Sequence, residues 1–201
     1  MLAGVLWLAT VLVGMGMLWA YAQKPGSAAH APTTWPAETR IPRGGRPVLV
    51  MLVHPHCPCT RASMAELARL MARLEHRVDA WVLFLKPKGT AAGWEKTDLR
   101  TRAAEIPGVH VLDDEDGREA ALFGASTSGQ ALLYDVTGRL RFAGGITIAR
   151  GHEGDSLGQA LIAAAVADPH PAPDPSAPAQ VGSTAVYGCA LADPPALGKA
   201  P

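Results

Sequence analysis

Residues 47–77 constrain the fold more than any other stretch, because two periodicities meet there at a pair of cysteines. The run "PVLVMLV" (residues 47–53) is continuously apolar, as expected for a strand buried on both faces. It is followed by "HPHCPC" and then by residues 60–77, whose apolar side chains recur at helical spacing. These side chains are Met64, Leu67, Met71 and Leu74. The junction of such a strand with such a helix predicts an α/β core.

The alternation of strand and helix patterns continues up to residue 168. The expected elements are a strand at 78–85, a helix at 95–106, a strand at 109–112, a hairpin of 130–135 and 139–144, and a helix at 157–167. The first strand–helix pairs predict parallel strands with crossover helices, and the hairpin adds an antiparallel edge. The sequence therefore predicts a mixed sheet flanked by helices.

Residues 1–22 contain no charged side chain. As a helix they would rise about 33 Å, enough to cross a bilayer core of about 30 Å. The alternative is a cleaved secretory signal, for which "AYA" at residues 20–22 is a suitable cleavage site. No Lys or Arg precedes the apolar run, and this favours one transmembrane anchor. Both alternatives place the rest of the chain outside the cytoplasm.

The orientation of this helix is predicted less directly. Lys24 and three arginines follow it, and the positive-inside rule applied to them would keep the domain inside. Most of these charges lie beyond the nearest flank. We therefore expect a membrane-anchored domain on the extracytoplasmic, periplasmic side.

The chain divides into four parts. After the anchor or signal (1–22), residues 23–46 are rich in Pro, Ala, Thr and Gly without periodicity, which predicts a flexible tether. Residues 47–168 have the size of one compact domain. Residues 169–201 form a Pro/Ala-rich tail that opens with a proline linker and contains the apolar island "STAVYGCALAD" with Cys189.

Charge and cysteine content exclude several classes of function. Basic and acidic residues balance at 18 each, and no basic stripe is interleaved with aromatics, so nucleic acid is a poor candidate partner. Three cysteines are too few for a disulfide scaffold and an odd number leaves one unpaired, which favours cysteine chemistry. No cofactor-binding fingerprint is present, so we expect no cofactor unless the cysteines hold a metal.

The element order and the place of the cysteines resemble the thioredoxin superfamily. In residues, the resemblance rests on "HCPC", on "FGASTSGQALLYDVTGRL" and on the glycine pair in "FAGG". More narrowly, "HPHCPCTRAS", "TSGQALLYD", "GGIT-ARGHEGD" and "YGCAL" together look like the membrane-anchored RedB-like redoxins. This resemblance implies a thiol–disulfide oxidoreductase or redox sensor acting on protein thiols or a redox partner protein.

Two departures from the thioredoxin pattern bear on the chemistry. Only Pro58 separates Cys57 from Cys59, where thioredoxins have two residues, and a disulfide across one residue closes a small, strained ring. Gly129 stands where the family keeps a cis-proline. The resemblance implies that Thr127, Ser128 and Gly129 flank the thiols and offer backbone hydrogen bonds to a substrate.

The position of Cys57 favours it as the nucleophile. A thiol at a helix N-terminus is exposed to the positive end of the helix dipole, which stabilises the thiolate. Cys59 would then be the resolving thiol, with His54 and His56 tuning the thiolate. The alternative is a copper- or zinc-binding delivery module with His54, His56, Cys57 and Cys59 as ligands, although four ligands in six residues are cramped. A third possibility is a redox-inactive interaction platform.

Cys189 also has two interpretations. It is either a stray thiol in a disordered tail or part of an island that docks on the domain through Val186, Tyr187 and Leu191. In the second case it would be a resolving thiol or a third metal ligand. About ten extended residues reach some 30 Å, so the linker does not forbid the docking.

Overall fold

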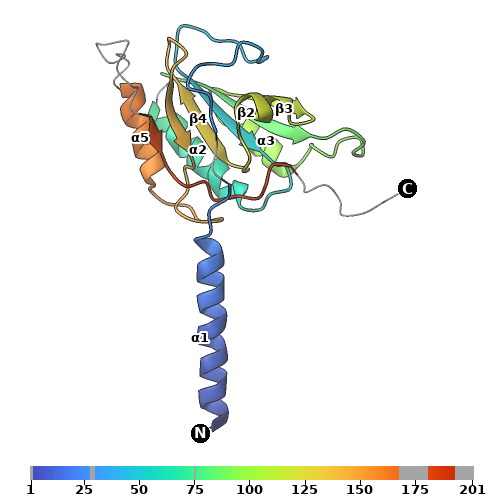
Figure 1. Cartoon of the computed structure of the whole chain (residues 1–201), viewed down its shortest axis with the longest axis vertical. Coiled ribbons are helices and arrows are strands. Elements are labelled where there is room, and N and C mark those ends of the chain that lie inside the picture. The colour runs from blue at the N-terminus through green and yellow to red at the C-terminus, as the bar shows by residue number, and fades with distance from the viewer. Residues whose placement is uncertain (1, 28–29, 75, 168–180, 193–201) are drawn as a thin grey trace.

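The computed structural model describes residues 2–27, 30–74, 76–167 and 181–192. A helix, α1 (Leu2–Ala22), extends away from a domain in which helices flank a six-stranded sheet (Figure 1). The strand order is β3-β2-β1-β4-β5-β6. The predicted mixed α/β architecture and its element order are confirmed. The predicted proline linker at 169–178 lies outside the described residues.

The sheet is parallel on one side of its central strand and mainly antiparallel on the other. β1 (Val48–Val53), β2 (Asp79–Lys86) and β3 (Val109–Glu115) run parallel. β4 (Gln130–Tyr134) pairs antiparallel with β1, and β5 (Leu140–Gly144) antiparallel with β4. All six residues of β1 are buried, which explains why its sequence is apolar at every position rather than at every second one.

A short strand, β6 (Gly182–Ser183), adds to the free edge of β5 in parallel. It belongs to the C-terminal tail. Its two residues carry no alternating pattern, so the sequence could not predict it.

Helices cover both faces of the sheet, unequally. α2 (Thr60–Leu74), α3 (Asp98–Ala104) and α5 (Leu157–Ala167) pack on one face, where Leu67, Leu99 and Ile162 belong to a single buried cluster. The short α4 (Arg118–Leu122) lies on the other face, beside Phe123 and Tyr134.

The second face is completed by a segment for which the sequence predicts a flexible tether. The Trp35 ring meets the rings of Phe123 and Tyr134 edge-on, at centroid distances of 5.4 and 5.2 Å. Tyr134 Oη donates to the carbonyl of Pro32 at 3.0 Å, and Ile41 is buried. Within the predicted tether, residues 32–41 thus pack on the sheet, because isolated anchors hold a stretch that has no periodicity.

Glu119 fixes the same segment by electrostatics. Its buried carboxylate accepts hydrogen bonds from Thr39 Oγ1 at 2.5 Å and from the backbone N–H and Nε of Arg40 at 3.2 and 3.1 Å. Hydrogen bonds from several donors of this kind offset the free-energy cost of burying a carboxylate.

α1 is long and apolar enough to cross a membrane, and none of its residues is buried in the protein. It joins the domain at the end where the C-terminal tail crosses (Figure 1). There the Ala22 carbonyl accepts a hydrogen bond from the Arg150 backbone N–H at 2.9 Å.

Candidate active site

Cys57 and Cys59 lie in the turn that joins the carboxyl end of β1 to the N-terminus of α2. The turn is closed by hydrogen bonds from Cys57 N–H to the His54 carbonyl (3.1 Å) and from Thr60 N–H to the Cys57 carbonyl (3.2 Å). Both cysteines are buried. The two thiols thus lie at the N-terminus of a helix, as the sequence predicts.

Residues 181–192, named here the C-terminal strap, cross over this turn. After β6, Thr184 Oγ1 donates to the Gly145 carbonyl at 2.8 Å. Farther along, the Leu191 N–H donates to the Ser126 carbonyl at 2.9 Å, and the Ser128 N–H donates to the Cys189 carbonyl at 2.8 Å. The strap therefore docks on the domain, as the second interpretation of Cys189 requires.

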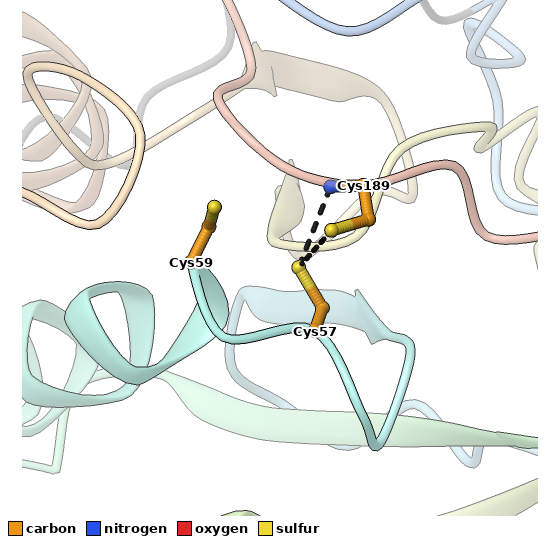
Figure 2. A group of neighbouring side chains, drawn as sticks. All are labelled: Cys57, Cys59 and Cys189. Atoms are coloured by element: carbon orange, nitrogen blue, oxygen red, sulfur yellow. Dashed lines mark hydrogen bonds between the residues drawn. The ribbon is translucent and has the colours of Figure 1, made fainter. Parts of the chain in front are cut away.

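The three cysteine side chains point into one space between the turn and the C-terminal strap (Figure 2). Cys57 Sγ lies 2.9 Å from Cys189 Sγ, and the Cys189 N–H also points at Cys57 Sγ, at 3.4 Å. All three sulfur atoms lie within 4.8 Å of one another. Cys189 is 132 positions from Cys57 in the sequence, so only the folded chain brings them together.

The environment makes the three thiols unequal. Burial alone would raise the pKa of Cys57, but hydrogen bonds from Cys189 and Thr60 outweigh it and lower that pKa. Burial, the hydrogen bond to Cys57 and the negative charges on Cys57 and Cys59 raise the pKa of Cys189 to about 12. Burial and the Cys57 charge also raise the pKa of Cys59. Of the three thiols, Cys57 is thus the one whose pKa is lowered, while the pKa values of Cys59 and Cys189 are raised.

Arg150 is a residue of the site that the sequence analysis missed, because "RGHEGDS" is typical of a glycine-rich loop. Its Nη1 donates to the Gly188 carbonyl at 2.6 Å and its Nε to the Lys24 carbonyl at 2.8 Å. Its guanidinium also lies over the Tyr21 ring, 5.3 Å from the centroid. Its charge acts to lower the pKa of Cys59, against the two larger causes that raise it. Arg150 therefore links α1, the C-terminal strap and a thiol.

The two predicted histidines lie beside Trp94. The rings of His54 and His56 contact the Trp94 ring at centroid distances of 5.4 and 4.6 Å, and His56 Nε2 lies 3.0 Å from the Trp94 carbonyl oxygen. Among the described residues, the group of metal-ligating atoms that come together contains cysteines alone. The ligand set of two histidines and two cysteines is thus not assembled. The groups that shift the pKa of Cys57 are Cys189 and Thr60 rather than either histidine.

The predicted substrate loop lies beside the thiols. Ser128 Oγ accepts a hydrogen bond from the His54 N–H at 2.9 Å and shares one with Thr60 Oγ1 at 2.8 Å. Gly129 has a φ of +87°, and a Cβ there would lie 2.8 Å from Ser63 Oγ. The positive φ and the lack of space for a Cβ both favour glycine at this position, and the described residues contain no cis peptide bond.

Comparisons with known proteins locate the fold. No family model and no curated protein matches the chain. A solved structure of an uncharacterized conserved protein from Geobacillus kaustophilus is similar over 87% of this chain and 93% of its own, with 17% identity and a TM-score of 0.58. A hypothetical protein from Sinorhizobium meliloti 1021 is similar over 84% and 93%, with 21% identity and a TM-score of 0.52.

A third similar structure is that of a secreted disulfide oxidoreductase from Mycobacterium tuberculosis, with 16% identity, a TM-score of 0.41 and 61% and 81% of the two chains covered. In this chain, a central strand leads into a cysteine turn and a helix, followed by a parallel neighbour and an antiparallel hairpin. On this topology, the chain has a thioredoxin-like fold.

Proposed function

We propose that this protein is a membrane-tethered thiol–disulfide oxidoreductase whose nucleophile is Cys57. One observation carries the proposal: a thiol with a lowered pKa at a helix N-terminus lies 2.9 Å from a second thiol. The thiolate is the attacking species in disulfide exchange, and a neighbouring thiol is what releases the mixed disulfide. Protein thiols or a redox partner protein are the proposed partners.

The reaction proceeds in two exchanges. The Cys57 thiolate attacks one sulfur of a substrate disulfide, so the substrate S–S bond breaks and a mixed disulfide forms as one substrate thiolate leaves and takes up a proton. A second protein thiol then loses its proton and attacks Cys57 Sγ. This releases the other substrate thiol and leaves a protein disulfide. Two electrons pass from the protein dithiol to the substrate, and the reverse sequence oxidises a substrate dithiol.

The distances favour Cys189 over Cys59 as the resolving thiol. Cys189 Sγ lies 2.9 Å from Cys57 Sγ, at hydrogen-bond distance, whereas Cys59 Sγ lies within 4.8 Å of both. The short ring that a Cys57–Cys59 disulfide must close also disfavours that pair. Cys59 then serves as a second thiol that exchanges with the Cys57–Cys189 disulfide.

A glutathione redox titration of the full chain in detergent tests this function. We expect a reversible two-electron transition, with mass spectrometry of the non-reduced digest joining the peptides of Cys57 and Cys189. Cys57→Ser should abolish the transition. A chain whose cysteines stay reduced across the whole buffer range would contradict the proposal.

A second candidate function, soft-metal binding, is favoured by the three converging sulfur atoms. Thiolates bind Cu(I) and zinc well, and a Zn–S bond of about 2.3 Å places neighbouring thiolates about 3.8 Å apart. The sulfurs of Cys57, Cys59 and Cys189 could reach such a spacing with small movements, since all lie within 4.8 Å. This ligand set replaces the histidine-containing one.

Metal retention separates the two candidates. The reduced full chain is loaded with Cu(I) or zinc and passed over a chelator of known affinity. One metal per chain, held under reducing conditions and lost in Cys189→Ser, would favour the metal function. A reversible disulfide with no retained metal would favour the oxidoreductase. If neither outcome is observed, the redox-inactive interaction platform is the remaining possibility.

A further inference from the structure

The C-terminal strap makes the contacts that an extended partner would make. Thr127 and Ala190 form an antiparallel bridge, flanked by the hydrogen bonds that join Leu191 to Ser126 and Ser128 to Cys189. Addition of an extended segment to exposed backbone groups is a general mode of peptide recognition, with affinity from the backbone and specificity from alternate side chains. The thiol of this added segment lies on Cys57.

We propose that residues 188–191 are an intramolecular substrate mimic, and that the substrates are extended polypeptide segments carrying the pattern small residue, cysteine, any residue, apolar residue. This inference rests on the proposed oxidoreductase function and specifies its substrate class. The sequence Gly188-Cys189-Ala190-Leu191 then indicates which side chains the site accepts at each position of a substrate.

The position before the cysteine must be small. Gly188 is buried, and a Cβ there would overlap the carbonyl oxygen of Ser128 and lie 3.3 Å from the Thr127 methyl group. The obstacle on the Ser128 side is backbone, which cannot turn aside as a long side chain can. A larger residue at this position would lift the segment off the loop and move its cysteine away from Cys57.

The two positions after the cysteine differ from each other. Ala190 is exposed, so the site places no requirement on the side chain at this position. Leu191 is only 3% exposed and belongs to the cluster that contains Ile41, Phe123 and Leu132. A charged side chain in that place would lose the apolar contacts and be desolvated without a partner.

Cys57 is covered while the strap is docked. The Cys57 side chain is only 3% exposed. The strap is also held from the N-terminal side of the chain, because the Gly26 N–H donates to the Val186 carbonyl at 2.8 Å. A polypeptide substrate must therefore displace the strap. Because the strap is tethered, it competes at an effective concentration on the order of millimolar, so only segments that fit the same contacts displace it well.

The same exchange accounts for resolution. When a substrate cysteine forms a disulfide with Cys57, it takes the place of Cys189. The strap then returns, Cys189 loses its proton and attacks Cys57 Sγ, and the substrate leaves as a thiol. One cysteine-containing segment replaces another on the same backbone groups, and the electron balance is that of the two exchanges above.

The test uses the full chain in detergent with Cys59→Ser and Cys189→Ser, so that Cys57 is the reacting thiol. The probe is the peptide STAVYGCALAD with its cysteine in a mixed disulfide with thionitrobenzoate, whose release is read by absorbance. We expect Gly188→Ala and Leu191→Asp, each of which should expel the strap, to accelerate release about tenfold or more. Gly45→Ala is the matched control, because a Cβ there meets nothing within 4 Å.

Peptide variants then test the pattern on the Gly188→Ala chain. Valine in place of the glycine, or aspartate in place of the leucine, should each slow release about tenfold, a loss of about 1.4 kcal/mol. Serine in place of the alanine after the cysteine should leave the rate unchanged.

Equal rates for all four peptides, or no effect of expelling the strap, would overturn the inference. In that case dithiobis-nitrobenzoate, a small disulfide that needs no docking, would still react with Cys57 and the proposed function would stand. Failure of Cys57 to react with this small disulfide as well would overturn both.

Discussion

The pKa of Cys57 depends on one residue that is remote in sequence. Cys189 provides both a thiol and a backbone N–H to Cys57 Sγ, and the hydrogen bond with the thiol is the largest of the effects that lower the Cys57 pKa against burial. Hydrogen bonds to the charged form of an acid favour that form.

Replacement of Cys189 by alanine should therefore raise the pKa of Cys57. The pH midpoint of its alkylation, followed by mass spectrometry, should move upward, because the largest hydrogen bond to the thiolate is lost. The midpoint is the measured quantity because uncovering Cys57 changes the absolute rate. His56→Ala serves as the control and should leave the midpoint in place, since His56 is not among the groups that shift the pKa of Cys57. An unmoved midpoint in Cys189→Ala would contradict this account.

Arg150 should act on Cys59 rather than on Cys57. Its charge and hydrogen bond lower the pKa of Cys59 against burial, and Cys57 is not subject to a comparable effect. In a chain with Cys57→Ser and Cys189→Ser, Arg150→Gln should raise the pH midpoint of Cys59 alkylation, because the positive charge beside the thiolate is lost. The exposed Arg102, replaced in the same way, provides the comparison and should not change it.

The residues of the site differ in how far the sequence predicts them. Cys57 and Cys59 follow from local pattern, because a buried strand and an amphipathic helix leave the turn between them at one end of the sheet. His54 and His56 share that turn, yet a turn does not determine where its rings point, and Trp94 lies against both. Arg150 and Cys189 reach the site through tertiary contacts that leave no periodic signal.

At the scale of elements, Glu66 connects α2 to the loop that carries Arg150 and to α5. It is 1% exposed and accepts hydrogen bonds from Arg69 Nη1 at 2.5 Å, from the Gly154 N–H at 2.6 Å and from Gln159 Nε2 at 2.7 Å. The loss of a buried acceptor leaves its donors unsatisfied.

Glu66→Ala should lower the free energy of unfolding by about 3 kcal/mol, because it removes one partner of a buried, charged network. Urea denaturation followed by circular dichroism measures the change. The exposed Glu105→Ala on the same side of the domain should cost less than about 0.5 kcal/mol. Equal effects for the two variants would show that the Glu66 network does not stabilise the fold.

The helices and strands were predictable from the sequence where burial gives their apolar residues a regular pattern. β1 and α5 agree closely with their predicted bounds, while α3 begins at Asp98, three residues after the predicted start. Residues 32–41 were not predictable as folded chain, because their anchoring depends on Trp35 and Ile41, two side chains without a repeat. Single anchors are visible only once their partners on the sheet are placed.

At the scale of the molecule, we expect α1 to hold the domain at a membrane. We expect the full chain to stay with membranes after alkaline carbonate extraction and to keep its N-terminal residues, because an apolar helix of this length is stable across a bilayer. A charged pair, Leu8→Arg with Leu12→Arg, should release it, since each charge at the membrane centre costs about 3 kcal/mol. A mature chain that begins near residue 23 would show a cleaved signal instead.

The side of the membrane is a separate question, answered by a membrane-impermeant maleimide on intact cells. Cysteines on the periplasmic side should be labelled after reduction without disruption of the cytoplasmic membrane. Labelling that requires lysis would place the domain inside, the orientation that the positive charges after α1 favour.

The separation of Cys57 and Cys189 by 132 positions has a consequence for the unfolded chain. A disulfide between them would close a loop that contains nearly the whole sheet, and loop closure of this size removes conformational entropy worth about 5 kcal/mol from the denatured ensemble. The oxidised chain should therefore melt at a higher temperature than the reduced chain, and Cys189→Ser should remove the difference. Each turnover would then alternate the domain between a cross-linked, more heat-resistant form and an open, less stable one, so that the thiol balance of its compartment also sets how readily it unfolds.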